Sequence, residues 1–342
     1  MSVPTLSETR IFDRALEYAR EKIIPGITQN AIDALPGISV FAGRLAEAMF
    51  GPLVMQGRGK RMHTGGESIV NKVRLGVNQN RKTLTSFYDT FDTTPSDTVR
   101  HTRANWKLAG DVINISNHEV RTASGEFAIA NIVQSEVTDG IASLVDLIGT
   151  HLFDAGGVAS RLTDLNTIVS AGDTIHGLSG VTYPVWNSRG LSARGTAPGS
   201  VSFAGGSFAA VGLDNWRTAW SNAEEGTEVP DILLTTHDIK TFYEATLQPQ
   251  ERFNNNKLAD AGFMMLQFKS APVAADPHCN TGNTYFLNMG HIFLDVLAGA
   301  DFSTGEFIEP EAQDVRIAKV VFTGEITTDA RKLQNKVTSQ TA

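Results

Sequence analysis

The residues best placed to do chemistry each have an ordinary structural explanation. Asp276, His278 and Cys279 are close in sequence and are of types that ligate metals. Their string, DPHCNTGN, separates two apolar stretches, so we interpret it as a polar turn between strands. His237 and Asp238 follow the stretch DILLTT, where Thr236 can cap a helix and the carboxylate favours its first turn. We therefore predict no catalytic, metal-binding or cofactor-binding residue.

The motifs of common enzyme classes are missing from the sequence. It contains no G-x-x-x-x-G-K-[ST], no G-x-G-x-x-G, no H-E-x-x-H and no G-x-S-x-G. The glycines of GRGKR and of Gly65-Gly66 could approach a phosphate, but a turn before a strand explains them more simply. The sequence therefore favours a protein that is not an enzyme, and an α+β hydrolase using His237 or His278 is kept only as an alternative.

Composition limits the class of protein. With 342 residues and 41% hydrophobic content, the chain is long enough for two domains or for one domain with large extensions. A net charge of -8 argues against a general DNA or membrane binder, and one cysteine excludes a disulfide framework. The N-terminal residues lack the apolar core of a signal peptide, and no apolar run is long enough to span a membrane. We expect synthesis and folding in a cytosol, and no membrane partner.

Charge is distributed unevenly along the chain. Residues 58–107 contain ten basic and four acidic residues, a balance of +6, whereas residues 126–342 contain 13 basic and 25 acidic residues, a balance of -12. A basic segment of one copy could lie on the acidic surface of another copy. This pattern is a basis for self-association.

The elements that would position these residues begin with an arm and a long helix. Residues 5–22 have the periodicity of an amphipathic helix, which Pro25 and Gly26 end, and the mixed stretch after it has no core of its own. A capping box at 116–119 and apolar residues at steps of three or four then predict a helix over 117–153. At about 55 Å, such a helix would be an architectural strut.

Two alternating stretches, 69–80 and 106–115, predict strands joined by roughly 25 polar residues. The linking segment contains three large apolar side chains, Phe87, Tyr88 and Phe91. We interpret it as a projecting two-stranded loop whose aromatic residues need a surface that their own subunit does not provide.

The C-terminal half mixes helices and strands. The stretch LDNWRTAWSNAEEG predicts a helix, DILLTT a strand and HDIKTFYEATLQPQERF a second helix, and strands follow to the end. The order indicates the α+β class with no βαβ repeat, which excludes a dinucleotide-binding fold.

Several of these stretches carry a resemblance to a known family. The residues are 231–236 (DILLTT), 247–253 (LQPQERF), 260–263 (DAGF), 268–273 (FKSAPV) and 285–288 (YFLN). Together with the upstream HTGGESIVNKVRLGVNQNRKTLTSFYDTFDT and the closing RIAKVVFTGEITTDARK, they resemble the major capsid proteins of tailed bacteriophages. The resemblance covers roughly residues 60–330 and is most specific over 230–290.

The resemblance implies the Hong Kong 97-like capsid fold. The implied parts are an N-terminal arm (1–57), a P-domain (58–67 and 113–195) with a spine helix at about 117–153, an E-loop (68–112), an A-domain (196–311) and a C-terminal return to the P-domain (312–342). In the fold's namesake an E-loop lysine is cross-linked to an asparagine of a neighbour. Lys72, Lys82 and the asparagines 254–256 are available here but match no motif, so no cross-link is predicted.

The implied function is self-assembly into an icosahedral head shell that encloses double-stranded DNA in a virion. The subunits would form pentamers and hexamers in the host cytoplasm, with the E-loop and the arm lying across neighbours. A separate scaffolding protein, a portal and decoration proteins would be further partners, and the DNA would be bound non-specifically. An encapsulin-type nanocompartment shell, which shares the fold, is the main alternative. We expect the following inter-subunit contact residues: Arg74, Arg81, Lys82, Phe87, Tyr88, Phe91, Arg100 and Arg103.

Overall fold

The computed structural model describes residues 59–76, 80–84, 86, 88–91, 93–94, 98–122, 126–154, 158–170, 172–188, 201–202, 207–247 and 266–341. The predicted arm, its amphipathic helix at 5–22 and the asparagines 254–256 lie outside these residues. The chain forms two compact units, each made from three segments of sequence. The first unit contains Met1–Gly65, Trp106–Leu162 and Leu294–Glu325, and the second contains Gly66–Asn105, Thr163–Phe293 and Ile326–Ala342.

The first unit is built on a five-stranded sheet with the order β1-β12-β14-β13, in which β4 also pairs with β14. Its strands are β1 (Lys60–His63), β4 (Lys107–Ser116), β12 (Ile292–Leu297), β13 (Ser303–Thr304) and β14 (Val315–Thr328). Strand β1 is parallel to β12, and β4 is antiparallel to β14 over its whole length. An ion pair joins β1 and β12: the Arg61 guanidinium donates to the buried carboxylate of Asp295 at 2.7 and 2.8 Å. Lys60 of β1 bonds to Asp301, which follows β12.

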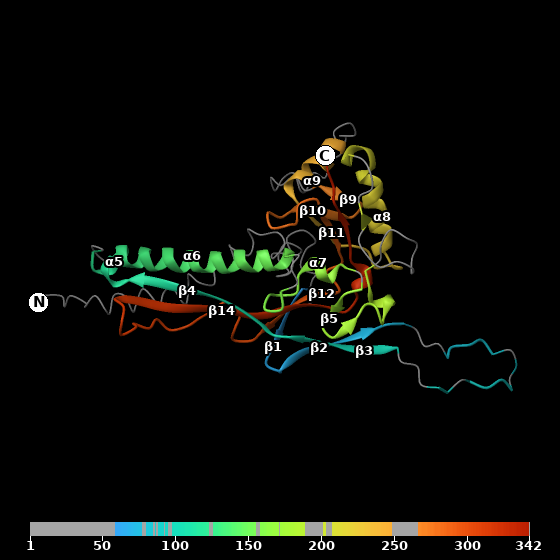
Figure 1. Cartoon of the computed structure of the whole chain (residues 1–342), viewed down its shortest axis with the longest axis horizontal. Helices are drawn as coiled ribbons and strands as arrows, with labels where there is room; N and C mark the ends of the chain where they lie inside the picture. The colour runs from blue at the N-terminus through green and yellow to red at the C-terminus, as the bar shows by residue number, and fades with distance from the viewer. Residues whose placement is uncertain are drawn as a thin grey trace, which may run out of the picture. The chain divides into compact units, whose positions relative to one another are not determined.

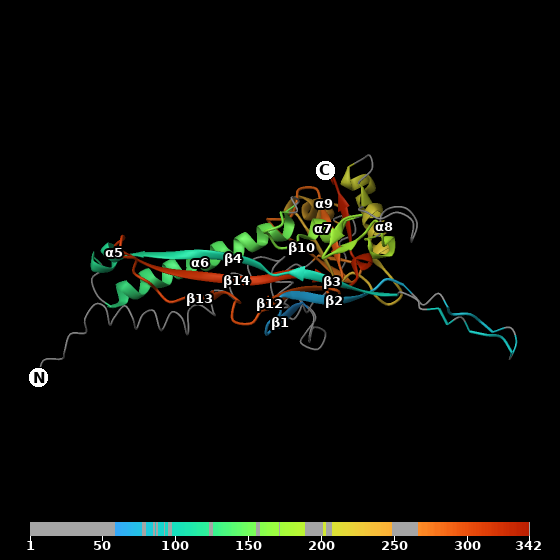
Figure 2. The ribbon, with the colours of Figure 1, turned by 60° about the horizontal axis from the view of Figure 1, so that its bottom comes forward.

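Helix α6 (Glu126–Phe153) lies along β4 and β14 in Figures 1 and 2. Its apolar positions, including Val137, Ile141 and Leu144, are buried, as the periodicity predicts. Gly140 is required by the packing, because a Cβ there would lie 2.8 Å from Cγ1 of Ile113 on β4. The predicted helix over 117–153 is present as two helices, α5 (Asn117–Thr122) and α6, and residues 123–125 between them are not described.

Strands are present in both predicted stretches, 69–80 and 106–115, but they do not form the two sides of one hairpin. Strand β2 (Ser68–Arg74) pairs instead with β3 (Val99–Asn105), and the stretch at 106–115 belongs to β4, which pairs with β14. The sequence VRHTRAN of β3 looks like polar loop because its buried residues, Thr102 and Ala104, are small. Buried and exposed residues do alternate at the end of β3, but the buried residues are too weakly apolar for the pattern to be recognised in the sequence.

The second unit contains a six-stranded sheet with the order β7-β15-β11-β8-β10-β9. The strands are β7 (Val201–Ser202), β8 (Ile232–Thr235), β9 (Gln267–Phe268), β10 (Ala271–Ala275), β11 (Thr284–Leu287) and β15 (Asn335–Thr338). The helices are α7 (Leu165–Ile168), α8 (Leu213–Ala223) and α9 (His237–Leu247), with a π-helical turn at Phe208–Gly212 and 3-10 turns at Pro184–Trp186 and Arg331–Leu333. A small hairpin, β5 (Thr174–Ile175) and β6 (Leu178–Ser179), completes the unit.

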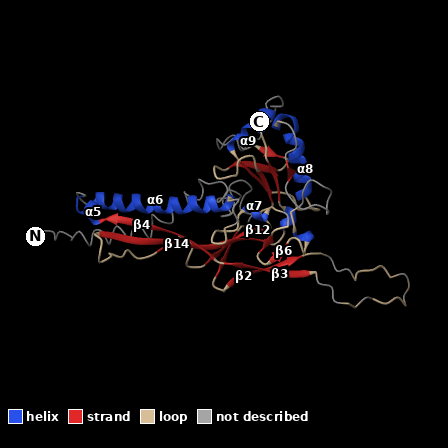
Figure 3. Ribbon diagram, viewed as in Figure 1, coloured by secondary structure: helices blue, strands red, loops and turns tan. Residues whose placement is uncertain are grey.

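Helices α8 and α9 lie beside strands of this sheet (Figure 3). Both helices share one aromatic core with the sheet. The fully buried Trp216 of α8 lies 4.9 Å from the ring of Tyr243 on α9 and 5.9 Å from that of Phe286 on β11. Its indole N–H donates to the side chain of Gln340 at 2.8 Å, so the polar end of the ring is satisfied as well. The helices predicted at 213–226 and from 237, and the strand at 231–236, are confirmed.

One feature of this sheet does not follow the predicted pattern. Strands β8 and β10 are parallel, and α9 lies between them in sequence, so the chain makes a single β-α-β crossover. We expected no βαβ repeat. One β-α-β unit is present, and it is not repeated among the described residues. The other neighbours of β8 and β10 are antiparallel, as the α+β class requires.

A buried cation holds the segment 164–188 in the second unit. The guanidinium of Arg331, which is fully buried, donates to the carbonyl oxygens of Ile168 at 2.8 Å and Ser170 at 2.8 Å, and it lies 5.8 Å from the Trp186 ring centroid. Nearby, the buried ammonium of Lys336 donates to the carbonyl oxygen of Asn166 at 3.0 Å. Burial lowers the pKa of Arg331 to about 10, so it keeps its charge at neutral pH.

Candidate subunit interface on the β2–β3 hairpin

The β2–β3 hairpin has one face that is anchored within its own unit. Val73 and Leu75 are buried in a small cluster with Leu178 and Trp186, and the backbone N–H of Arg103 donates to the carbonyl oxygen of His176 at 2.8 Å. The two strands pair over seven residues, from Ser68 opposite Asn105 to Arg74 opposite Val99. The hairpin is therefore a fixed base for the segment that it carries.

The opposite face of the hairpin is basic. Alternation along the strands exposes Lys72, Arg74 and Arg103, together with Val70, which is opposite Arg103. We call Lys72, Arg74 and Arg103 the basic face. Within the described part of the chain, none of the three forms an ion pair. Three cations on one strand surface that have no ion pair among the described residues favour an acidic partner.

The predicted site residue Arg100 lies elsewhere. It is opposite the buried Val73, and its guanidinium carbon lies 5.7 Å from the ring centroid of Tyr183, a cation–π contact within the same unit. The structure thus brings together Arg74 and Arg103 but not Arg100. Lys72 and Val70, which were not among the expected contact residues, lie on the same face as Arg74, as the alternation over 68–74 indicates.

The segment between β2 and β3, residues 75–98, is called the connecting loop here; it leads away from β2 and β3 in Figure 1. Its aromatic residues are exposed: Tyr88 at 95% and Phe91 at 66%. Phe87 lies outside the described residues. Lys82 forms an ion pair with Asp89 at 2.8 Å inside the loop, and Arg81 is exposed. A buried aromatic ring gains about 1.5–3 kcal/mol over an exposed one, so this arrangement favours contact with another surface.

The other candidate residues have structural roles. Asp276 accepts the backbone N–H of His278 at 2.9 Å in the turn between β10 and β11, and Cys279 is buried there. Thr236 caps α9, with its hydroxyl 3.5 Å from the backbone nitrogen of Ile239. The polar turn and the cap are therefore confirmed. Among the residues that the structure describes, no group of three histidine, cysteine or acidic side chains could hold a metal ion, and no helix is long and apolar enough to cross a membrane.

The glycines considered for phosphate binding belong to turns around β1. Gly59, Gly65 and Gly66 have φ angles of 106°, 157° and 120°, and they flank β1 on both sides. The basic residues between them, Lys60 and Arg61, are engaged with acidic residues of the same unit. Part of the +6 balance is thus used within the chain and is not available to a partner.

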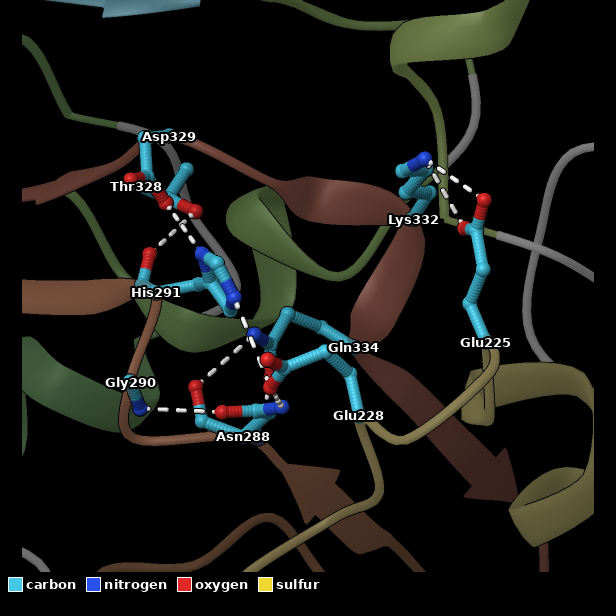
Figure 4. A network of polar contacts seen from close by, with 9 residues as sticks. All are labelled: Glu225, Glu228, Asn288, Gly290, His291, Thr328, Asp329, Lys332 and Gln334. Atoms are coloured by element: carbon cyan, nitrogen blue, oxygen red, sulfur yellow. Dashed lines mark hydrogen bonds and ion pairs between the residues drawn. The ribbon is translucent and has the colours of Figure 1, made fainter.

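A polar network closes the turn between β11 and β12 (Figure 4). His291 contacts Asp329 through Nδ1 at 2.8 Å and Glu228 through Nε2 at 3.8 Å. Asn288 and Gln334 exchange hydrogen bonds, in which the Asn288 backbone N–H donates at 2.7 Å and the Gln334 amide donates at 3.0 Å. These contacts join three loops of the second unit, so the network is explained by structure alone.

Comparison with known proteins gives one clear result. No protein-family model and no curated protein matches the sequence. Solved structures do match: a cyanophage A-1(L) capsid chain has 15% identity, a TM-score of 0.57, and coverage of 83% of this chain and 90% of that one. A capsid chain of a native GTA particle has 11% identity, a TM-score of 0.53, and coverage of 87% and 99%. The chain has the Hong Kong 97-like capsid fold.

A third structure extends the likeness. A chain of Mycobacterium phage Adephagia has 8% identity, a TM-score of 0.51, and coverage of 83% of this chain and 88% of that one. Identities this low show the shared fold and leave residue roles open. The predicted α+β class and the Hong Kong 97-like fold are confirmed.

Proposed function

We propose that this chain is the major capsid protein of a tailed bacteriophage, which self-assembles into an icosahedral shell around double-stranded DNA. The observation that carries the proposal is the fold, which this chain shares over more than four-fifths of its length with a capsid chain of a cyanophage. The exposed aromatic residues of the connecting loop support it, because a soluble subunit gains by burying them in another copy. The proposal assigns no catalytic role to any residue.

In assembly, the hairpin would place the connecting loop over a neighbouring subunit. The anchored side of the hairpin, with Val73 and Leu75, keeps its direction fixed, while Tyr88, Phe91 and the neighbouring Phe87 would be buried in the contact. The basic face would meet acidic residues of the neighbour, which sets orientation and register more than affinity. Many such contacts in one shell give avidity, so each can be weak.

The implied division of the chain is part of the proposal. An arm at 1–57, a P-domain at 58–67 and 113–195, an E-loop at 68–112, an A-domain at 196–311 and a C-terminal return at 312–342 would occupy the places that these parts have in the fold. Pentamers and hexamers, a separate scaffolding protein, a portal and decoration proteins would be its partners in the virion. A net charge of -8 would let packaged DNA slide along the inner wall.

Particle formation tests the proposal. The purified full chain is expected to form pentamers, hexamers or megadalton shells, seen by light scattering and negative-stain electron microscopy. A stable monomer or dimer under all assembly conditions would contradict it.

Substitution in the connecting loop tests the role of the aromatic residues. The triple variant Phe87→Ser, Tyr88→Ser, Phe91→Ser is expected to fold normally and to lose shells. The matched control is Thr83→Ala, Thr90→Ala, Thr93→Ala, three polar positions of the same loop, which should assemble like the parent. Normal shells from the serine variant would show that the contact between subunits does not depend on the connecting loop. The proposed capsid function would not be affected by this result.

A further inference from the structure

The segment between β13 and β14, residues 305–314, is acidic. It contains four acidic residues and no lysine or arginine. The carboxylates of Glu309 and Asp314 accept hydrogen bonds from side chains of α5. Glu306 and Glu311 are exposed, and neither forms an ion pair with any of the described residues. We call residues 305–314 the acidic segment, and two of its carboxylates are available to a partner.

Hydrogen bonds to β14 fix the backbone of the acidic segment. Ile308 and Ile317 exchange two backbone hydrogen bonds, each of 2.9 Å. The N–H of Gly305 donates to the carbonyl oxygen of Lys319 at 2.7 Å. The side chain of Lys319 is exposed, but it makes no ion pair with the acidic segment. The exposed carboxylates therefore stand on an ordered support, as the basic face does on the hairpin.

An exposed apolar side chain accompanies the charges on both surfaces. Ile308, which lies between Glu306 and Glu311 in the sequence, is 68% exposed. On the hairpin, Val70 is 53% exposed and lies directly opposite Arg103 of the basic face. Protein interfaces combine an apolar centre with a polar rim. The two surfaces thus have the same pattern and opposite charge.

The two surfaces also match in length. From Val70 to Arg74, strand β2 spans roughly 14 Å. The chain from Glu306 to Glu311 extends over at most about 18 Å, and the turn that begins at Pro310 shortens this distance. One surface is therefore long enough to cover the other.

We propose that the basic face of one copy binds the acidic segment of a second copy, with Val70 packed against Ile308. This inference rests on the proposed function and names the partner of the basic face. The two surfaces differ, so the contact is head-to-tail and is able to repeat from copy to copy until a ring closes. A phosphate backbone would also attract the cations, but it has no apolar surface for Val70, which favours a second copy over nucleic acid.

Charge reversal in the full chain tests the contact. The hairpin variant is Lys72→Glu with Arg103→Glu, and the segment variant is Glu306→Lys with Glu311→Lys. Each variant alone places like charges opposite one another, so the share of protein in oligomers, measured by sedimentation velocity, is expected to fall about tenfold or more. All four positions are exposed, so circular dichroism should show normal folding.

The matched control for the hairpin variant is Arg217→Glu with Lys240→Glu. It makes the same change in net charge on two helices of the same unit, α8 and α9. This control should associate like the parent chain. A similar loss in the control would mean that net charge, and not the contact, governs association, and the proposal would be wrong.

A mixture of the two variants shows whether the contact joins separate copies. In an equimolar mixture, the reversed hairpin of one variant meets the reversed segment of the other, so oligomers are expected to return. Each variant alone at the same total concentration is the reference. If only a single chain with all four reversals recovers association, the contact lies within one chain and the assignment to a second copy is wrong. Recovery in neither case would overturn the contact itself.

Other outcomes separate this contact from the capsid proposal. Association that persists in both reversed variants would overturn the contact, and so would a parent chain that stays monomeric under all conditions. If the hairpin variant associates normally but binds duplex DNA more weakly than the parent, the basic face belongs to nucleic acid. Shells that form in the parent and in both variants would leave the capsid function intact without this contact. Oligomers that depend on the contact but never become shells in electron micrographs would contradict the capsid function alone.

Discussion

Arg331 and the connecting loop lie in the same unit, but their side chains differ in burial and in the partners that they have. The guanidinium of Arg331 is fully buried and has carbonyl acceptors from the segment 167–173 around it. Tyr88 and Phe91 are exposed, and the neighbouring basic face has no ion pair within the described residues. In the first region the chain satisfies its own polar groups, and in the second it leaves both apolar area and charge for another surface. Substitutions should therefore affect folding in the first region and assembly in the second.

The largest effect on folding is expected from the aromatic core of the second unit. Trp216→Ala removes the ring at the centre of the cluster and should lower the free energy of unfolding by about 3–5 kcal/mol. Chemical denaturation followed by circular dichroism would measure it. A loss below about 1 kcal/mol would show that the core does not depend on this ring.

The second-largest effect on folding is expected from the buried guanidinium of Arg331. Arg331→Met leaves several buried carbonyl oxygens without a donor, and we expect a loss of about 2–4 kcal/mol by the same measurement. The control is Arg217→Met, which removes an exposed ion pair with Asp214 and should cost less than about 1 kcal/mol. Equal losses in the two variants would contradict the difference between buried and exposed charge.

Lys336 provides a pH test of the same region. Burial lowers its pKa to about 8, while Asp164 and Asp173 oppose the shift and Arg331 adds to it. The folded state therefore releases this proton at lower pH than the unfolded state. Lys336 should therefore contribute a positive slope to the pH dependence of the free energy of unfolding between about pH 8 and 10.5, worth up to about 3 kcal/mol in total.

Denaturation at several pH values would measure that slope. Lys336→Met should abolish it, whereas Lys332→Met, four residues earlier at a partly exposed ion pair with Glu225, should retain it. If the slope is still present in Lys336→Met, it is caused by another titrating group.

The smallest effect on folding is expected in the connecting loop. Tyr88→Ser with Phe91→Ser should change the free energy of unfolding by less than about 0.5 kcal/mol, because both side chains are mostly exposed. A loss above about 1.5 kcal/mol would mean that the rings pack on their own subunit, and the comparison between the two regions would fail.

The sequence predicted the elements whose periodicity is strongly apolar. The helices α6, α8 and α9 and the strand β14 fall where their patterns place them. Strand β3 was missed because Thr102 and Ala104 are small, and β1 was missed because KRMH is basic. Pairing over long distances, such as that of β4 with β14 and the parallel pair of β8 and β10, leaves no local mark in a sequence.

The candidate interface was predicted in part. The exposure of Tyr88 and Phe91 follows from their place in a polar segment too long for a tight turn, which the structure bears out. The members of the basic face could not be predicted from the sequence, because they depend on the register between β2 and β3. Arg100 lies on the side of Tyr183, whereas Lys72 lies on the same side as Arg74 and Arg103. The Arg331 cluster was not predicted at all, since its acceptors are backbone oxygens far away in sequence.

The pairing of β1 with β12 has a consequence for synthesis on the ribosome. Arg61 and Asp295, which lie opposite each other, are 234 residues apart in the chain. At 5–20 residues per second, β1 emerges roughly 10–50 s before its partner strand exists. The first unit therefore cannot close until most of the polypeptide has been made, whereas the β2–β3 hairpin can form early. Nascent chains pass through this interval with the inner apolar surface of α6 and β4 only partly covered, and a chaperone that binds apolar segments would act at this stage.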